Sequence, residues 1–107
     1  LTGKFTQKTT FQKGDWRGEQ RDRKWLLDLV NQVEKVKQII GNSMPLYEAA
    51  LKFCLSSDAV SATIPGARNL KQAELNFGIS DKELTKEELA KLRKLWSSGD
   101  TGGLKFA

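Results

Sequence analysis

One short run of β-branched residues constrains the fold more than any other feature of this sequence. Residues 59–64 (AVSATI) have the composition of a β-strand, and Pro65 and Gly66 end the run. None of the other segments in the 107 residues has this pattern. A buried strand without a neighbour leaves its backbone N–H and C=O groups without hydrogen bonds. We therefore expect this strand to pair with residues or chains outside the sequence.

The rest of the pattern is helical, and we expect about four helices. Residues 23–57 predict a helix pair, because apolar side chains recur there at three- and four-residue steps. Gly41 ends the first helix of the pair, and Ser43 is expected to cap the second. Short connections of this kind favour antiparallel packing.

Two further helices are predicted from their caps. Asn69 is expected to cap a helix that stops at Gly78. Thr85 begins a capping box, Thr-Lys-Glu-Glu, ahead of a last helix over residues 84–98. Residues 1–22 show neither the helical nor the strand periodicity of apolar residues, which predicts an extended loop.

Length and composition predict one small soluble domain, 38% apolar and 29% charged. No apolar run approaches the roughly 20 residues of a membrane span. Cys54 is the sole cysteine, which excludes a disulfide within the chain, and a buried thiol is its expected role. With no signal-peptide pattern at Leu1, we expect a cytoplasmic protein.

The charge points to an anionic partner. The chain has 18 Lys and Arg against 13 Asp and Glu, a net charge of +5. Residues 1–24 hold seven basic and three acidic residues, and therefore carry +4 of that charge. Nucleic acid, an acidic surface and a phosphate-bearing small molecule all suit such a loop.

The stretch IPGARN, residues 64–69, has the pattern of a phosphate site. A strand, a glycine turn and a helix start bring free backbone N–H groups and the positive end of a helix dipole together. Gly66 permits close approach of the backbone, and Arg68 adds a planar two-pronged donor. Turn geometry and solubility alone also explain a glycine and an arginine here.

The order of the motifs is more specific than any one of them. LTGKF, a basic loop ending in GDWR, two helices, AVSATIPGARN and LTKEEL follow one another along nearly the whole chain. Together they resemble the C-terminal third of the aldo-keto reductases, in the bacterial branch related to the potassium-channel beta subunits. The resemblance implies an α/β fold, the C-terminal portion of a (β/α)8 TIM barrel of about 250 residues. It makes residues 1–22 a cofactor-covering loop and residues 59–77 the last barrel strand with its helix.

The resemblance also implies that this chain binds NADPH. The backbone of residues 66–67 and the side chains of Arg68 and Gln72 would hold the adenosine 2′-phosphate. Asn76 would bind the adenine edge, and Lys4 and Arg17 would lie over the pyrophosphate and adenosine. The implied cofactor-binding residues are thus Lys4, Arg17, Gly66, Ala67, Arg68, Gln72 and Asn76. Leu75 departs from the family pattern, which has a glutamate at this position.

The catalytic residues are expected to lie elsewhere. The family reduces aldehydes and ketones with an Asp-Tyr-Lys-His tetrad in the first half of the barrel. This chain has no His, and its one tyrosine, Tyr47, is expected to be a partly buried structural ring. No His/Cys cluster suits a metal. We expect no catalysis from this chain alone; its partners would be the N-terminal barrel half or another chain, and a small carbonyl substrate.

Two other functions stay open. The chain is alternatively a small helical module that has lost catalysis and acts through association with itself or a partner. As a third alternative, residues 1–24 bind nucleic acid, with tryptophan stacking beside Arg17, Arg23 and Lys24. Core packing is favoured for Trp25 and Trp96, which belong to apolar stripes, and leaves Trp16 as the freest tryptophan.

Overall fold

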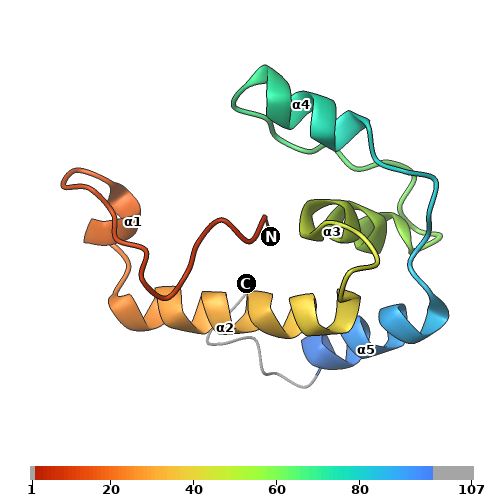
Figure 1. Cartoon of the computed structure of the whole chain (residues 1–107), viewed down its shortest axis with the longest axis horizontal. Helices are drawn as coiled ribbons and strands as arrows, with labels where there is room; N and C mark the ends of the chain where they lie inside the picture. Colours follow the sequence, from red (N-terminus) through yellow and green to blue (C-terminus); the bar gives the residue numbers. More distant parts are fainter. Residues whose placement is uncertain (1, 98–107) are drawn as a thin grey trace.

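The computed structural model describes residues 2–97, and this part of the chain is helical (Figure 1). Its helices are α1 (Trp16–Glu19), α2 (Arg23–Ile40), α3 (Leu46–Leu55), α4 (Leu70–Phe77) and α5 (Lys86–Ser97). In Figure 1, α3 and α5 gather at the C-terminal end of α2, whereas α4 lies apart from that group. None of the helices within residues 2–97 has the length and apolar character that crossing a membrane requires.

The helices begin and end largely where their caps predict. The Asn69 side chain accepts a hydrogen bond from Gln72 N at 2.9 Å, so it caps α4 as expected. Thr85 and Glu88 form the predicted capping box, with Glu88 N bonded to Thr85 Oγ1 at 3.1 Å and Thr85 N to Glu88 Oε2 at 2.8 Å. The helix expected over residues 84–98 is α5, although residue 98 lies outside the described residues.

The expected cap at Ser43 is wrong. Pro45 precedes α3 as its N-terminal cap and makes no side-chain cap hydrogen bond. The Ser43 hydroxyl instead donates to Glu88 Oε1 at 3.1 Å, which ties the turn after α2 to α5. A tertiary partner has thus replaced the local one. One further helix, α1, forms inside the segment that was expected to be loop.

The predicted strand is not formed. Residues 59–64 contain no strand, as is true of all residues 2–97. Val60 N bonds only backward to Ser57 O at 2.9 Å, in a turn, and Ile64 is 96% exposed. The reason is the one that the sequence suggests: a strand needs a neighbour to complete its ladder, and the described chain offers none.

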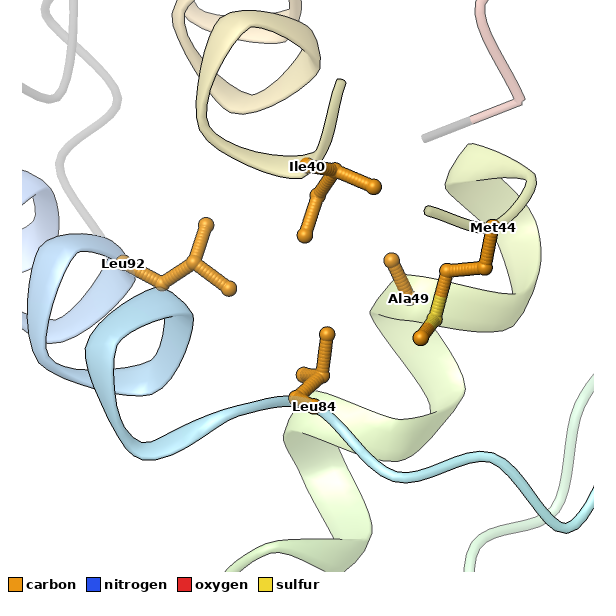
Figure 2. Close-up of a cluster of buried hydrophobic side chains, with 5 residues drawn as sticks. All are labelled: Ile40, Met44, Ala49, Leu84 and Leu92. Atoms are coloured by element: carbon orange, nitrogen blue, oxygen red, sulfur yellow. The ribbon is translucent and has the colours of Figure 1, made fainter. Parts of the chain in front are cut away.

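The core is small and lies where α2, α3 and α5 meet. Figure 2 shows its side chains converging from the end of α2, the following turn, α3, the segment before α5 and α5 itself. The buried cluster consists of Ile40, Met44, Ala49, Leu84 and Leu92. Its members are all aliphatic or thioether side chains, so it is a packing core without polar chemistry.

Two expected core residues are on the surface. Cys54 is exposed, because it lies beyond the face of α3 on which Ala49 and Phe53 pack against the core. Trp96 is 58% exposed near the end of α5, whereas Trp25 is half-buried. Apolar periodicity predicts that a whole helix face is buried, whereas the neighbouring helices cover only part of that face.

A buried carboxylate fastens the segment between α4 and α5 to α3. Glu48 is only 6% exposed and accepts hydrogen bonds from the backbone N–H and the hydroxyl of Ser80. Lys52 Nζ lies 3.6 Å from Glu48 Oε1 and donates to Ser80 O at 2.5 Å. The Ser80 hydroxyl is the main cause of the lowered pKa of Glu48, and burial opposes it.

Candidate functional site

Arg17 is the most firmly held cation of the N-terminal loop. Its guanidinium donates twice to Asp15, from Nε at 2.9 Å and from Nη2 at 2.6 Å. It also lies over the rings of Phe11 and Phe5, 4.9 and 5.6 Å from their centroids. Hydrogen bonding to Arg17 lowers the pKa of Asp15 to about 2, and the same bond raises the pKa of Arg17. The pair therefore stays charged at neutral pH.

Helix α1 places Arg17 by purely local means. Asp15 caps the helix by accepting a hydrogen bond from Arg17 N at 3.0 Å, with the same carboxylate that holds the guanidinium. Gly14 precedes it at a φ of +88°, a conformation that favours glycine. A Cβ atom at Gly18 would lie 2.9 Å from Phe11 Cβ, so the absence of a side chain there lets α1 lie against Phe11.

A large open hollow lies beside this loop. It has a volume of about 1130 Å³ and is lined by residues of the N-terminal segment together with Arg68 from the turn before α4. Three predicted cofactor residues, which are far apart in the sequence, thus face the same space: Lys4, Arg17 and Arg68. Trp16 and Lys13 also line it. The hollow therefore has mainly cationic and aromatic walls.

A second hollow of about 550 Å³ adjoins the first through Lys4, which lines both. It holds three more of the predicted residues, Gly66, Gln72 and Asn76. Tyr47 lines it as well and is half-buried, as expected of a structural ring. Ala67 is exposed and lines neither hollow. The structure thus brings six of the seven predicted residues to two hollows that share Lys4.

Two of these residues also shape the turn before α4. Gln72 Oε1 accepts a hydrogen bond from Arg68 N at 2.8 Å, and Asn76 Nδ2 donates to Gly66 O at 3.1 Å. Since the Gln72 amide accepts through its oxygen, its Nε2 group is a donor for another acceptor, such as a phosphate oxygen. The helix thereby holds its own N-terminal turn in place.

The backbone at Gly66 is open to a ligand. Apart from its two chain neighbours, no atom of residues 2–97 would lie within 4 Å of a Cβ atom built on Gly66, and the φ of Gly66 is not in the left-handed region. Neither strain nor crowding within the chain therefore requires a glycine here. The missing side chain would instead let an incoming group approach the backbone of Gly66 closely. Together with Arg68 and Gln72, this open turn fits a phosphate group chemically.

The sequence reasoning missed the residues that hold Arg17. Asp15, Phe5 and Phe11 are not among the predicted site residues, yet they fix its guanidinium by two hydrogen bonds and two ring faces. A local signal for the first of these existed: Gly-Asp directly before Trp-Arg has the pattern of a turn followed by a helix cap. The ring contacts had no local signal.

Cationic side chains, an aromatic wall and an open glycine turn have the chemistry that suits a phosphorylated anion. The aldo/keto reductase family model matches residues 1–97 of the chain. The chain therefore belongs to the aldo/keto reductase family, a family of oxidoreductases that generally use NAD(P)H. The comparisons with curated proteins and with solved structures each gave no match.

Proposed function

We propose that this chain is the cofactor-binding C-terminal part of an NADPH-dependent aldo-keto reductase, in the bacterial branch related to the potassium-channel beta subunits. The observation that carries the proposal is the convergence of Lys4, Arg17 and Arg68 on one hollow in a chain of this family. Cations from opposite ends of the site suit a ligand that carries several phosphates, as NADPH does.

The adenosine 2′-phosphate is assigned to the turn before α4. Arg68 offers a planar pair of donors, and Gln72 offers its Nε2 group while its oxygen holds Arg68 N. The open backbone at Gly66 completes the cradle. Asn76 is assigned to the adenine edge, since it lines the second hollow. Its Nδ2 group also donates to Gly66 O, so the same residue holds the turn.

The pyrophosphate is assigned to the N-terminal loop. Arg17 is preoriented by Asp15 and the two phenylalanine rings, so little side-chain entropy is lost when it meets an anion. Lys4 lines both hollows and lies between the two phosphate sites. In this assignment residues 1–22 cover the cofactor.

Catalysis is assigned to the N-terminal barrel half. Bound NADPH supplies a hydride to the carbonyl carbon of an aldehyde or ketone. This chain's residues bind and orient the cofactor; the half-buried Tyr47 packs in the first turn of α3. Residues 59–64 support the need for the other half, because they form no strand ladder within residues 2–97 and leave Ile64 96% exposed.

The assignment is tested by replacing Arg68 with alanine in the protein as its source cell makes it. We expect NADPH affinity to fall about tenfold or more and NADH affinity to stay nearly constant, because only NADPH has the 2′-phosphate. Arg93→Ala on α5 is the matched control, since Arg93 is exposed and lines neither hollow. Equal losses of NADPH and NADH affinity in Arg68→Ala would contradict the assignment.

Association is the second candidate function, and the exposed apolar residues of 60–77 favour it. Leu70 is 75% exposed and Phe77 is 78% exposed on α4, in addition to Ile64. A helical module that acts by association would sediment as a dimer or larger species in analytical ultracentrifugation. The intact mass of the native protein separates the two candidates: a chain of about 250 residues or more indicates a barrel reductase.

A further inference from the structure

Trp16 does not belong to the buried core of residues 2–97. It is 54% exposed as the first residue of α1, a helix with no buried residue. Its ring lines the same hollow as Arg17 and Arg68. Trp25, by comparison, is half-buried and has Arg21 over its ring at 5.4 Å. An indole exposed in the same hollow as two guanidinium groups, on a helix that has no buried residue, offers a flat surface to a ligand.

We infer that Trp16 is the surface on which the adenine ring of the cofactor stacks. The inference rests on the proposed function, because it takes the 2′-phosphate to lie at Arg68. That phosphate and the adenine are attached to the same ribose, so the base lies close to the phosphate. Trp16 and Arg68 line the first hollow, and Lys4 lines both this hollow and the second one, where Asn76 is assigned to the edge of the same base. Aromatic faces are what purine rings stack on.

The residues next to Trp16 hold its backbone in position. Asp15 caps α1 directly before it, and Arg17 directly after it is held by the same carboxylate. The close contact of Gly18 with Phe11 holds the helix against the loop. A platform that is already positioned loses little freedom when a base stacks on it.

A single-stranded nucleic acid would use the same aromatic surface. Residues 1–24 carry +4 of the net charge, from seven basic and three acidic residues, which suits a polyanion. We favour the mononucleotide because Arg68, which belongs to a different part of the chain and is assigned to the 2′-phosphate, lines the same hollow. The experiment below separates the two ligands.

The test is calorimetric titration of the native protein with adenosine 2′,5′-bisphosphate, which has the base and the 2′-phosphate but no nicotinamide. Trp16→Ala should weaken its binding about tenfold. Trp16→Phe should recover most of the affinity, because a phenyl ring also stacks. Inorganic pyrophosphate, which has no base, should bind Trp16→Ala and wild type equally. Trp96→Ala is the matched control, an exposed tryptophan outside the hollow.

A spectroscopic readout distinguishes stacking from a structural effect. The indole N–H resonance of Trp16, identified by its absence in Trp16→Phe, should shift during titration with the bisphosphate, whereas that of Trp96 should not. Thermal unfolding followed by circular dichroism should be unchanged in Trp16→Ala, because α1 buries nothing.

The outcomes separate the two proposals. If Arg68→Ala weakens bisphosphate binding and Trp16→Ala does not, the stacking role is overturned and the proposed function stands. If wild type binds neither NADPH nor the bisphosphate, both fail. If Trp16→Ala weakens binding of a single-stranded oligonucleotide but not of the bisphosphate, the platform serves nucleic acid and the adenine assignment is overturned.

Discussion

Two isoleucines summarise the contrast between the packed and the open regions of this chain. Ile40, at the end of α2, is 2% exposed because α3 and α5 cover it (Figure 2). Ile64, in the irregular segment before α4, is 96% exposed. Their side chains are chemically identical, so the difference lies wholly in what surrounds them. Burial is a property of the tertiary environment and needs a partner surface.

Helix α4 shows how much can form without such a partner. Local hydrogen bonds hold both ends of α4: the Asn69 cap, the bond from Gly78 N to Glu74 O, and the contact of Asn76 with Gly66. Its apolar side chains Leu70 and Phe77 are nevertheless exposed. Local hydrogen bonds therefore hold this helix, whereas apolar packing holds α2, α3 and α5.

The largest expected effect is on the packed region. Ile40→Ala should lower the free energy of unfolding by about 2–4 kcal/mol, because it removes buried methyl groups and leaves a cavity. Ile64→Ala, the same change at an exposed position, should stay within about 0.5 kcal/mol. Urea unfolding followed by circular dichroism measures both. Equal losses would mean that the packed and open regions do not differ in the way the structure indicates.

The buried carboxylate should come next. Glu48→Gln should cost about 1–3 kcal/mol, because Ser80 and Lys52 lose their charged partner in a buried place. The lowered pKa of Glu48 sets the sign of the pH dependence. Its stabilisation is fully present above the ordinary value of 4.5 and is lost as the pH falls below that value through the folded-state pKa.

Glu87→Gln is the matched control for this prediction. Glu87 pairs with Lys91 at 2.6 Å on the surface of α5, where solvent screens the pair. Acid titration of unfolding should therefore be flatter for Glu48→Gln than for wild type, and nearly unchanged for Glu87→Gln. A wild-type slope retained in Glu48→Gln would show that another group causes the acid sensitivity.

A smaller and local effect is expected at the cap of α4. Asn69→Ala should weaken the helix by about 1 kcal/mol, because Gln72 N loses its acceptor. Since α4 has no buried residue, the loss should appear as faster amide hydrogen exchange in α4, with little change in α2 or α5. Uniformly faster exchange throughout the chain would show that α4 is coupled to the core.

The smallest effect on stability is expected at Gly66. Gly66→Ala should change the unfolding free energy by less than about 1 kcal/mol, and in the stabilising direction, since the added Cβ meets nothing. The same variant should bind NADPH more weakly, because the methyl group narrows the approach to the backbone. Gly18→Ala is the contrasting change, which should destabilise the loop through the contact with Phe11. Unaltered NADPH binding in Gly66→Ala would remove Gly66 from the site.

The candidate site was only partly predictable from the sequence. Lys4 and Arg17 are predicted through the resemblance and Arg68 also from the pattern of residues 64–69, but nothing in their spacing indicates that they face one hollow. Phe11, which helps to orient Arg17, is not predictable because a ring contact depends on how the loop folds back on itself, whereas the pairing of Arg17 with Asp15 is local. The sequence pattern makes Trp16 the freest tryptophan, but only the structure shows that it lines the same hollow as Arg68.

By itself, the sequence determined the elements whose hydrogen bonds close within a few residues. The caps at Asn69 and Thr85 and the end of α2 at Gly41 belong to this class, because donor and acceptor are neighbours along the chain. Only the tertiary structure decided the features that need a distant partner. The Ser43 hydroxyl donates to Glu88, and residues 59–64 form no strand. A hydrogen-bond ladder and a buried surface exist only where a second segment supplies the other side.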